Sequence, residues 1–374
     1  MDIITFKAHE FMHCLNELAS VVPKKSSTYM VCKYVAVTFK DGQAILTGSN
    51  AKVQISIKTN VNHSGAPKNF LFQFDKVYAI AKRSKQCETV TFSIEESKKI
   101  QLQFNGINAT YKLNSMSYKE FIWLKSEKLD HTDTLLCSKV HASIAKVTHI
   151  KEKKRDLDAV LKGVHLYIHD GDILAVNTDG HRLALHTHSE TPELFTGNPV
   201  VIPDDAAEML MKMCATYLDN EITLGYNDSA FKAVVEKTQI VFSLHGGRFP
   251  DLRKIVPDNQ PYHAILDRKI LASSLKTLGT IAADERFSRM SFDFGNDSIT
   301  IKTENKLKEA GEVDMSVGGE NSPIHIAVAH NYMTEAISSL EGDQVKLSYD
   351  EPNKPIKITE VGSEGHINVI MPMR

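Results

Sequence analysis

The chain has 374 residues, of which 42% are hydrophobic, so it can form ordinary buried cores and is long enough for two or three domains. A formal net charge of −2 disfavours a protein that grips nucleic acid over a broad basic surface, unless acidic residues elsewhere balance one basic face. No apolar run nears the roughly 18 residues of a membrane span, and the first residues lack a signal-peptide pattern. The 5 scattered cysteines show no CxxC spacing, so we expect a reducing, cytoplasmic location.

Each third of the chain begins with the same predicted unit, a short strand that leads into an amphipathic helix. In the first unit, Phe11, Leu15 and Leu18 recur at helical spacing, which predicts one buried helix face. The three units cover residues 3–19, 133–150 and 263–281.

A two-stranded hairpin is predicted after each of these helices. Asp-Gly pairs at 41–42 and 170–171 lie between strands whose apolar residues alternate, and an Asn-Asp pair at 296–297 forms the third turn. An Asp-Gly pair is a strong hairpin signal because both residues tolerate positive φ.

A second helix is predicted in each third, over residues 75–85, 203–215 and 329–340, with Asp75 and Asp204 as N-cap candidates. Hairpins and second helices recur with the same two offsets, 129 and then 126 residues. Two independent landmarks that share their offsets indicate an internal repeat.

The repeat predicts an α+β fold of three similar domains, each with two helices packed on antiparallel sheets. Polar segments that break the periodicity, at 125–133 and 256–262, are the predicted linkers. The expected domains are residues 1–126, 127–256 and 257–374.

Basic residues cluster at similar places in the repeats and in two loops between them. A single such cluster is more often a solvated surface, but recurrence also favours contact with the phosphates of a nucleic acid. The candidates are Lys24, Lys25, Lys82, Arg83, Lys139, Lys146, Lys153, Lys154 and Arg155, with Lys85, Lys151, Arg268, Lys269 and Lys276 beside them.

The segment NTDGHRLALHTH, residues 177–188, concentrates polar residues beside apolar ones. His186 and His188 fall on one face of a predicted strand and could begin a metal site with Glu190, but no third ligand follows at a zinc-site spacing. No nucleophile elbow or phosphate-binding glycine loop accompanies the segment. We therefore expect no active site, no metal and no cofactor.

Three motifs together resemble a known family. TDGHRLAL at 178–185, GRFPDLRKIVP at 247–257 and VIMPMR at 369–374 are similar in order and spacing to the beta subunit of bacterial DNA polymerase III, the sliding clamp. The resemblance covers the whole chain. It implies a non-catalytic processivity factor, in which two three-domain subunits close head to tail into a ring around double-stranded DNA and hold the polymerase on its template.

The resemblance also implies an apolar groove for short peptides of the DNA polymerase III catalytic subunit, the clamp loader and other proteins that carry a clamp-binding motif. The alternative for His181 and Arg182 is that they only brace their turn. For the dimer interface, the resemblance points to Tyr111, Leu113 and Ile281. The groove would be lined by Leu161, Thr178, Gly180, His181, Arg182, Leu183, Pro250, Lys254, Ile255, Val369, Ile370, Met371, Pro372, Met373 and Arg374.

Two other functions stay open at this point. A clamp-like scaffold or decoy would bind the same peptides without encircling DNA, and would be monomeric. A metal-dependent hydrolase built on the histidine-rich hairpin would retain metal when purified.

Overall fold

The structure is a computed structural model of the 374-residue chain. Within its described residues, no helix is long and apolar enough to cross a membrane. The chain forms two compact units, residues 1–137 with 212–244 and residues 138–211 with 245–374. The structure describes residues 2–23, 29–84, 86–94, 99–106, 109–124, 129–151, 163–189, 199–244, 255–282 and 288–373.

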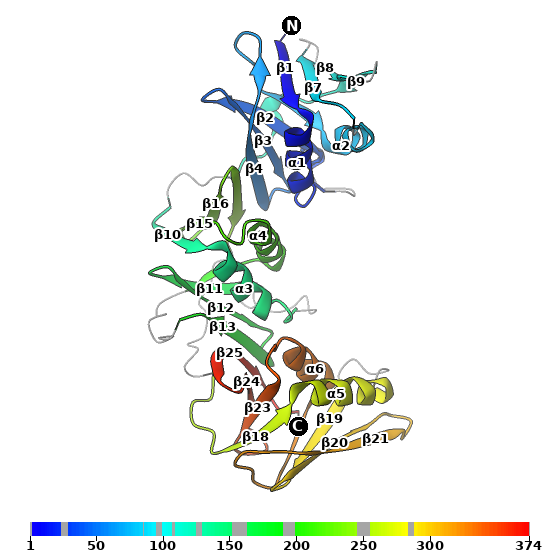
Figure 1. The fold of residues 1–374 in the computed structure, drawn as a ribbon, viewed down its shortest axis with the longest axis vertical. Coiled ribbons are helices and arrows are strands. Elements are labelled where there is room, and N and C mark those ends of the chain that lie inside the picture. The colour runs from blue at the N-terminus through cyan, green and yellow to red at the C-terminus, as the bar shows by residue number, and fades with distance from the viewer. Residues whose placement is uncertain are drawn as a thin grey trace. The chain divides into compact units, whose positions relative to one another are not determined.

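The described residues contain the six predicted helices, and the first helix of each repeat follows a short strand as expected (Figure 1). Phe11, Leu15 and Leu18 are fully buried, so the helical spacing of apolar residues identified the face that packs on the sheets. The helices are α1 (Ala8–Leu18), α2 (Phe74–Arg83), α3 (Cys137–Val147), α4 (Asp204–Thr216), α5 (Arg268–Ala282) and α6 (His330–Ser338).

Both Asp-Gly turns have the backbone that the sequence predicts. Asp41 and Gly42 have φ values of 52° and 75°, and Asp170 and Gly171 have values of 46° and 77°. Two consecutive positive φ values suit the right-handed twist of the flanking strands. The third turn differs because neither Asn296 nor Asp297 has a positive φ, and the Gly295 N–H donates to the Ser298 carbonyl at 2.7 Å.

The predicted N-cap role of the two aspartates is wrong. Helix α2 begins at Phe74, and Gln73 precedes it without a side-chain capping hydrogen bond. Burial of Phe74, which is 2% exposed, starts the helix one residue before Asp75. Asp204 is likewise the first residue of α4 rather than its cap. Both carboxylates still lie in a first turn, where the helix dipole favours negative charge.

The first unit holds two antiparallel sheets with α1 and α2 packed against them (Figure 1). Their strand orders are β5-β1-β7-β8-β9 and β10-β15-β16-β17-β4-β3-β2-β6. The strands of the five-stranded sheet are Asn62–His63, Asp2–Lys7, Thr89–Ile94, Lys99–Phe104 and Thr110–Asn114. The strands of the eight-stranded sheet are His131–Leu136, Glu221–Tyr226, Ala230–Val235, Thr238–Ser243, Val53–Asn60, Gln43–Ser49, Tyr34–Lys40 and Phe70–Gln73.

The second unit holds two further antiparallel sheets, and α5 lies beside α6 (Figure 1). Their strand orders are β14-β11-β12-β13-β25-β24-β23-β18 and β21-β20-β19-β22. The strands of the eight-stranded sheet are Val200–Ile202, Val164–His169, Asp172–Thr178, Arg182–Thr187, Ser363–Ile370, Ile356–Glu360, Gln344–Tyr349 and Tyr262–Asp267. The strands of the four-stranded sheet are Ala310–Ser316, Ser298–Glu304, Arg289–Phe294 and Ile324–Ala329.

Each eight-stranded sheet contains strands from two consecutive repeats. In the first unit, β4 of the N-terminal third pairs with β17 of the central third. In the second unit, β13 of the central third pairs with β25 of the C-terminal third. These two strand pairs, called here the β4–β17 and β13–β25 junctions, connect consecutive repeats by main-chain hydrogen bonds. The segment TDGHR lies at the β13–β25 junction.

Candidate functional site

The turn between β12 and β13 is held by its own side chains. The Asp179 Oδ1 atom accepts hydrogen bonds from the N–H groups of His181, at 3.0 Å, and Arg182, at 3.1 Å. The Thr178 hydroxyl donates to the Arg182 carbonyl at 2.7 Å. Gly180 has φ of 83°, a conformation that favours glycine. The sequence Thr-Asp-Gly therefore specifies one turn geometry.

This turn leaves Gly180 and His181 at the surface. A Cβ atom built on Gly180 would meet no atom within 4 Å, so the backbone there is open to a ligand. The His181 side chain is exposed, which leaves its ring nitrogens accessible to hydrogen-bonding partners.

The C-terminal segment runs alongside this turn. Strand β25 pairs with β13, and the Met371 N–H continues the ladder by donating to the His181 carbonyl at 2.9 Å. The Met373 N–H donates to the Ala327 carbonyl at 2.7 Å. The segment is thus fixed by main-chain hydrogen bonds, while the Met371 side chain stays 46% exposed.

Three distant segments contribute apolar side chains to one cluster beside the turn. Leu183 and Val369 are each 2% exposed, and the half-buried Ile255 packs against the same cluster. By contrast, Ile370 and Met373 pack with the core of the C-terminal repeat. The structure thus brings together Leu183, Ile255 and Val369 from the predicted groove, while Leu161, Pro250, Lys254 and Arg374 lie outside the described residues.

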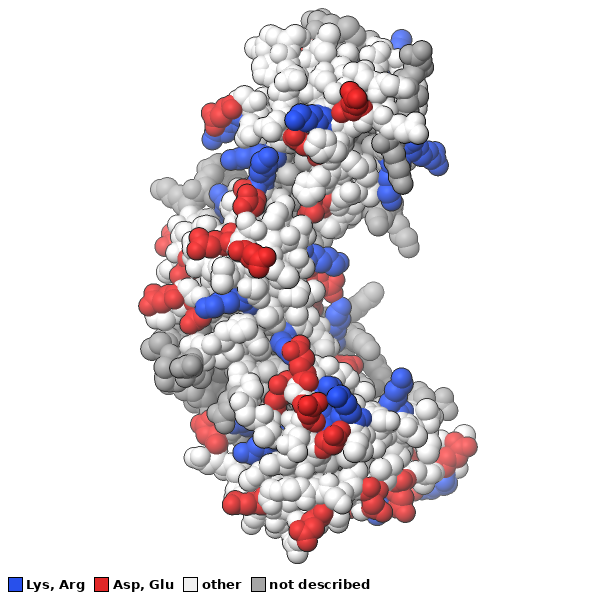
Figure 2. Space-filling model, viewed as in Figure 1, with Lys and Arg blue, Asp and Glu red and all other residues white. Residues whose placement is uncertain are grey.

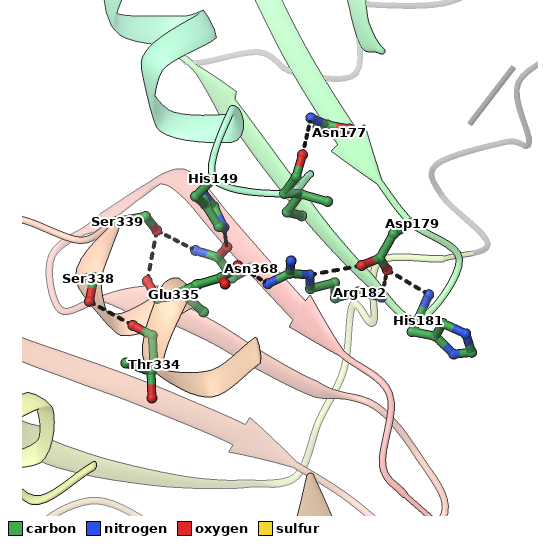
Figure 3. A network of polar contacts seen from close by, with 12 residues as sticks. His149, Asn177, Asp179, His181, Arg182, Thr334, Glu335, Ser338, Ser339 and Asn368 are labelled. Carbon is green, nitrogen blue, oxygen red and sulfur yellow. Dashed lines mark hydrogen bonds and ion pairs between the residues drawn. The ribbon is translucent and has the colours of Figure 1, made fainter. Parts of the chain in front are cut away.

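The Arg182 side chain points inward and connects the turn to α6 (Figure 3). Its Nε atom lies 3.0 Å from Asp179 Oδ2, and its Nη1 atom lies 2.6 Å from Glu335 Oε2. The guanidinium carbon also lies 4.3 Å from the centroid of the Tyr332 ring. Because the side chain is only 6% exposed and pairs with Asp179, Arg182 braces the turn.

A layer of buried polar side chains continues from Arg182 across the β13–β25 junction (Figure 3). The Asn368 amide Oδ1 lies 3.1 Å from His149 Nε2, and its Nδ2 atom lies 3.2 Å from both the Ser339 hydroxyl and His366 Nε2. His186 Nδ1 lies 3.2 Å from the Ser143 hydroxyl. The layer couples the two strands to α3 and to the end of α6.

Three histidines of this layer are held in the neutral state. Burial lowers the pKa of His186 to about 3, with further lowering by His188 and His366. Burial also lowers the pKa of His366 to about 4, and that of His149 to about 4, where the Arg182 charge adds to the effect. An uncharged imidazole there both accepts and donates hydrogen bonds.

The predicted basic residues divide into paired and exposed ones. Lys139 Nζ lies 2.7 Å from Asp172 Oδ1, and Lys146 Nζ lies 2.8 Å from Glu341 Oε1. Lys82 and Arg83 are exposed in the last turn of α2. Figure 2 shows basic and acidic side chains interspersed over the face in view. The other candidates, Lys24, Lys25, Lys153, Lys154 and Arg155, lie outside the described residues.

Of the three residues predicted for a dimer interface, two lie on an edge strand and the third lies on a helix beside another edge strand. Tyr111 and Leu113 are half-buried on β9, the edge strand of the five-stranded sheet. Ile281 lies near the end of α5 against β21, the edge strand of the four-stranded sheet. A Cβ atom added at Gly311 of β21 would come within 2.7 Å of Ile281 Cδ1.

One motif was missed in the sequence. Residues 9–13 read HEFMH and match HExxH, a pattern that places two histidines on one helix face. His9 and His13 do lie on α1, and both are exposed. In the described part of the chain, no group of three or more His, Cys, Asp or Glu side chains is arranged to hold a metal ion. The described residues thus lack the three protein ligands of a catalytic zinc site.

Known proteins resemble this chain over its full length. A curated beta sliding clamp of Pseudomonas putida is 22% identical over 358 residues, 96% of each chain. One of Staphylococcus aureus is 21% identical over 387 residues, with 99% of this chain and 98% of that protein covered.

Solved structures share the fold. The DNA polymerase III subunit beta of Pseudomonas aeruginosa superposes with a TM-score of 0.91 at 19% identity, and all of both chains is covered. The corresponding subunit of Thermotoga maritima gives a TM-score of 0.86 at 16% identity, again with both chains fully covered.

Family profiles match almost the entire sequence. The N-terminal, central and C-terminal domains of the DNA polymerase III beta subunit match residues 3–125, 135–251 and 253–374, respectively. The matches agree with the threefold repeat and with the helices and hairpins of the structure. The chain therefore belongs to the DNA polymerase III beta subunit family, whose members are sliding clamps and act as non-catalytic processivity factors in DNA replication.

Proposed function

We propose that two copies of the chain close head to tail into a ring around duplex DNA, and that the groove beside TDGHR docks the partners that use the ring. The observation that carries the proposal is the presence of two free sheet edges of opposite charge, β9 and β21, at opposite ends of the repeat series. The same proposal includes three domains, residues 1–126, 127–256 and 257–374. It also includes a cytoplasmic location.

The two edge strands are complementary in chemistry. Strand β9 alternates exposed and half-buried residues, with Lys112 exposed between Tyr111 and Leu113. Strand β21 alternates in the same way, with Glu312 and Asp314 exposed. Pairing β9 of one copy with β21 of the next would satisfy both rows of main-chain groups and bring opposite charges together. Because each copy carries one edge of each kind, copies can join head to tail, and we propose that two of them close the ring.

A charge-reversal series tests the interface. We expect Lys112→Glu to weaken dimerisation by about tenfold, measured by sedimentation, because it places acidic side chains opposite Glu312. The double variant Lys112→Glu with Glu312→Lys should recover the affinity, since it restores opposite charges at both interfaces. Weakening without recovery in the double variant and in a matching Asp314→Lys double variant would argue against β9–β21 pairing.

Contact with DNA is proposed for exposed basic residues, Lys82 and Arg83 above all. A sliding ring needs only weak phosphate contacts, because strong ones would stop its movement. The wild-type protein, loaded by a matching clamp loader, should stay on circular DNA and be lost once the DNA is linearised. Replacing Lys82 and Arg83 with Ala should reduce loading at low salt and leave dimerisation unchanged. Equal retention on linear and circular DNA would contradict encirclement.

Peptide docking is proposed for the surface formed by Gly180, His181, Leu183, Ile255 and Met371. The open backbone at Gly180, the exposed Met371 side chain and the apolar cluster beside them support a site for an aliphatic or aromatic anchor. The expected partners are the DNA polymerase III catalytic subunit, the clamp loader and other proteins with a clamp-binding motif. Six further residues would support this surface from behind or beside it: Thr178, Arg182, Val369, Ile370, Pro372 and Met373.

Titration with a Gln-Leu-x-Leu-Phe-type peptide tests the groove. We expect binding by the wild-type dimer and loss of binding when residues 371–374 are deleted. Light scattering on the same samples separates the alternatives. A monomer that binds the peptide would favour the scaffold or decoy function, and a dimer that does not bind it would overturn the groove but not the ring.

A further inference from the structure

A cavity of about 440 Å³ in the first unit is lined by none of the residues proposed for the groove or for the two sheet edges. Two histidines of α1, His9 and His13, line it together with Ile57, Lys58 and Thr59 of β4. The central repeat contributes Tyr217 and Asn220, which follow α4, and Glu236 and Lys237, which form the turn between β16 and β17. The proposed clamp function assigns no role to this cavity.

The two histidines have the spacing of a helical chelate. Residues four apart lie one above the other on a helix face, so the imidazoles of His9 and His13 can reach the same point. Both side chains are exposed, and both line the cavity. Neither ring has a hydrogen bond or ion pair with a described residue, so no competing contact holds it.

Four other polar residues of the cavity are already engaged: Glu10, Thr59, Asn220 and Glu236. The Glu10 carboxylate accepts a hydrogen bond from the Thr59 hydroxyl at 3.2 Å and lies 3.7 Å from Lys7 Nζ. Glu236 accepts a hydrogen bond from the Asn220 amide at 2.7 Å. The protein would therefore offer a cation the two imidazoles of His9 and His13 as nitrogen ligands, and water would complete its coordination.

We propose that His9 and His13 form a two-histidine site for a divalent transition-metal ion. Imidazole ligands favour Zn²⁺, Ni²⁺ and Cu²⁺ over Mg²⁺ or Ca²⁺, which prefer oxygen ligands. Two protein ligands give an open, exchangeable site rather than a structural one. No hydrolytic activity is proposed, since a catalytic zinc site uses three protein ligands.

Calorimetric titration of the full-length protein with Ni²⁺ tests the site. We expect one equivalent of Ni²⁺ to bind more tightly than the rest, and His9→Ala or His13→Ala to weaken that step by about tenfold or more, because either change removes the chelate. His63→Ala is the matched control, since His63 is an exposed histidine on the short strand β5, outside the cavity. It should leave the strong step intact.

A spectroscopic readout distinguishes the site from scattered surface binding. With one equivalent of Cu²⁺, electron paramagnetic resonance should show coupling to two imidazole nitrogens in the wild type and to fewer in His13→Ala. Circular dichroism should be unchanged, because both side chains are exposed. Equal Ni²⁺ affinity in the wild type and both single variants, or unchanged Cu²⁺ coupling, would overturn the proposal and leave the ring and the groove untouched.

Discussion

The β4–β17 and β13–β25 junctions are built on the same backbone. In each, an Asx side chain closes the preceding turn: Asn50 accepts hydrogen bonds from the second and third residues after it, as Asp179 does. The next residue has positive φ in both, 71° at Ala51 and 83° at Gly180. The offset of 129 residues relates the two turns, as it relates the hairpins.

The side chains at matching positions differ in kind. At three positions a buried apolar residue of the β4–β17 junction matches a buried polar one of the β13–β25 junction: Val53 matches Arg182, Ile57 matches His186 and Ile240 matches Asn368. At a fourth position, Thr238 matches His366, and both are buried and polar. The apolar set is Val53, Ile55, Ile57, Ile240 and Phe242. The residues at matching register are, in the same order, Arg182, Ala184, His186, Asn368 and Ile370. His366 pairs with His186.

The comparison shows that the features needed to form a junction are distinct from the side chains that make one junction different from the other. Main-chain pairing and a closed turn are enough to continue the sheet, since both junctions share them. Burial of apolar side chains stabilises the first junction without regard to pH or charge. The second depends on hydrogen bonds and on an ion pair that lock one arrangement, and the candidate groove lies on it. Each prediction below changes one of these polar contributions.

The largest expected effect is that of Arg182→Ala. Removing the guanidinium leaves Asp179, whose side chain is 6% exposed, without its charged partner, and it also releases Glu335. Loss of one partner of a buried ion pair costs about 3–5 kcal/mol. We expect a fall of that size in the free energy of unfolding, measured by urea denaturation. Ile55→Ala, at the apolar junction, is the control, and it should show a pure cavity effect of about 2–5 kcal/mol that does not depend on salt.

Much of the fold could be predicted because its signals are local. The Asp-Gly turns and the helical spacing of Phe11, Leu15 and Leu18 involve residues close in the chain. The role of Arg182 could not be predicted in the same way, since its partner Glu335 lies 153 residues away. The pairing of Lys146 with Glu341 is equally remote. Contacts between residues close in the chain could be predicted from the sequence, whereas contacts between distant residues could not, whatever the residue types.

Counted for each residue, the next largest effect is a loss of stability in acid. His149, His186 and His366 have folded-state pKa values of about 4, 3 and 4, below the ordinary value of about 6.5. The unfolded chain therefore takes up more protons below pH 6.5, so the stability is fully present above that pH and is lost as the pH falls toward 4. Between pH 7 and pH 5 we expect a loss of about 1–2 kcal/mol per histidine.

A transplant of the apolar junction chemistry provides the control. His186→Ile with His366→Thr introduces the residues found at the matching positions, Ile57 and Thr238. Urea denaturation of this variant should show a much smaller difference between pH 7 and pH 5, because only His149 remains of these three histidines. An unchanged pH dependence in the double variant would mean that other groups cause the acid sensitivity.

The smallest predicted effect is that of Glu335→Gln. Glu335 is 37% exposed, so its ion pair with Arg182 is partly screened by solvent, and a glutamine oxygen can still accept the hydrogen bond. We expect a loss of about 0.5–1 kcal/mol. Asp179 still holds the guanidinium and the turn in this variant, so peptide affinity should stay within about twofold of the wild type, whereas Arg182→Ala should lower it much further. If Glu335→Gln weakened peptide binding as strongly as Arg182→Ala, α6 rather than the turn would control the groove. The polar junction would then connect the two repeats instead of only bracing the turn.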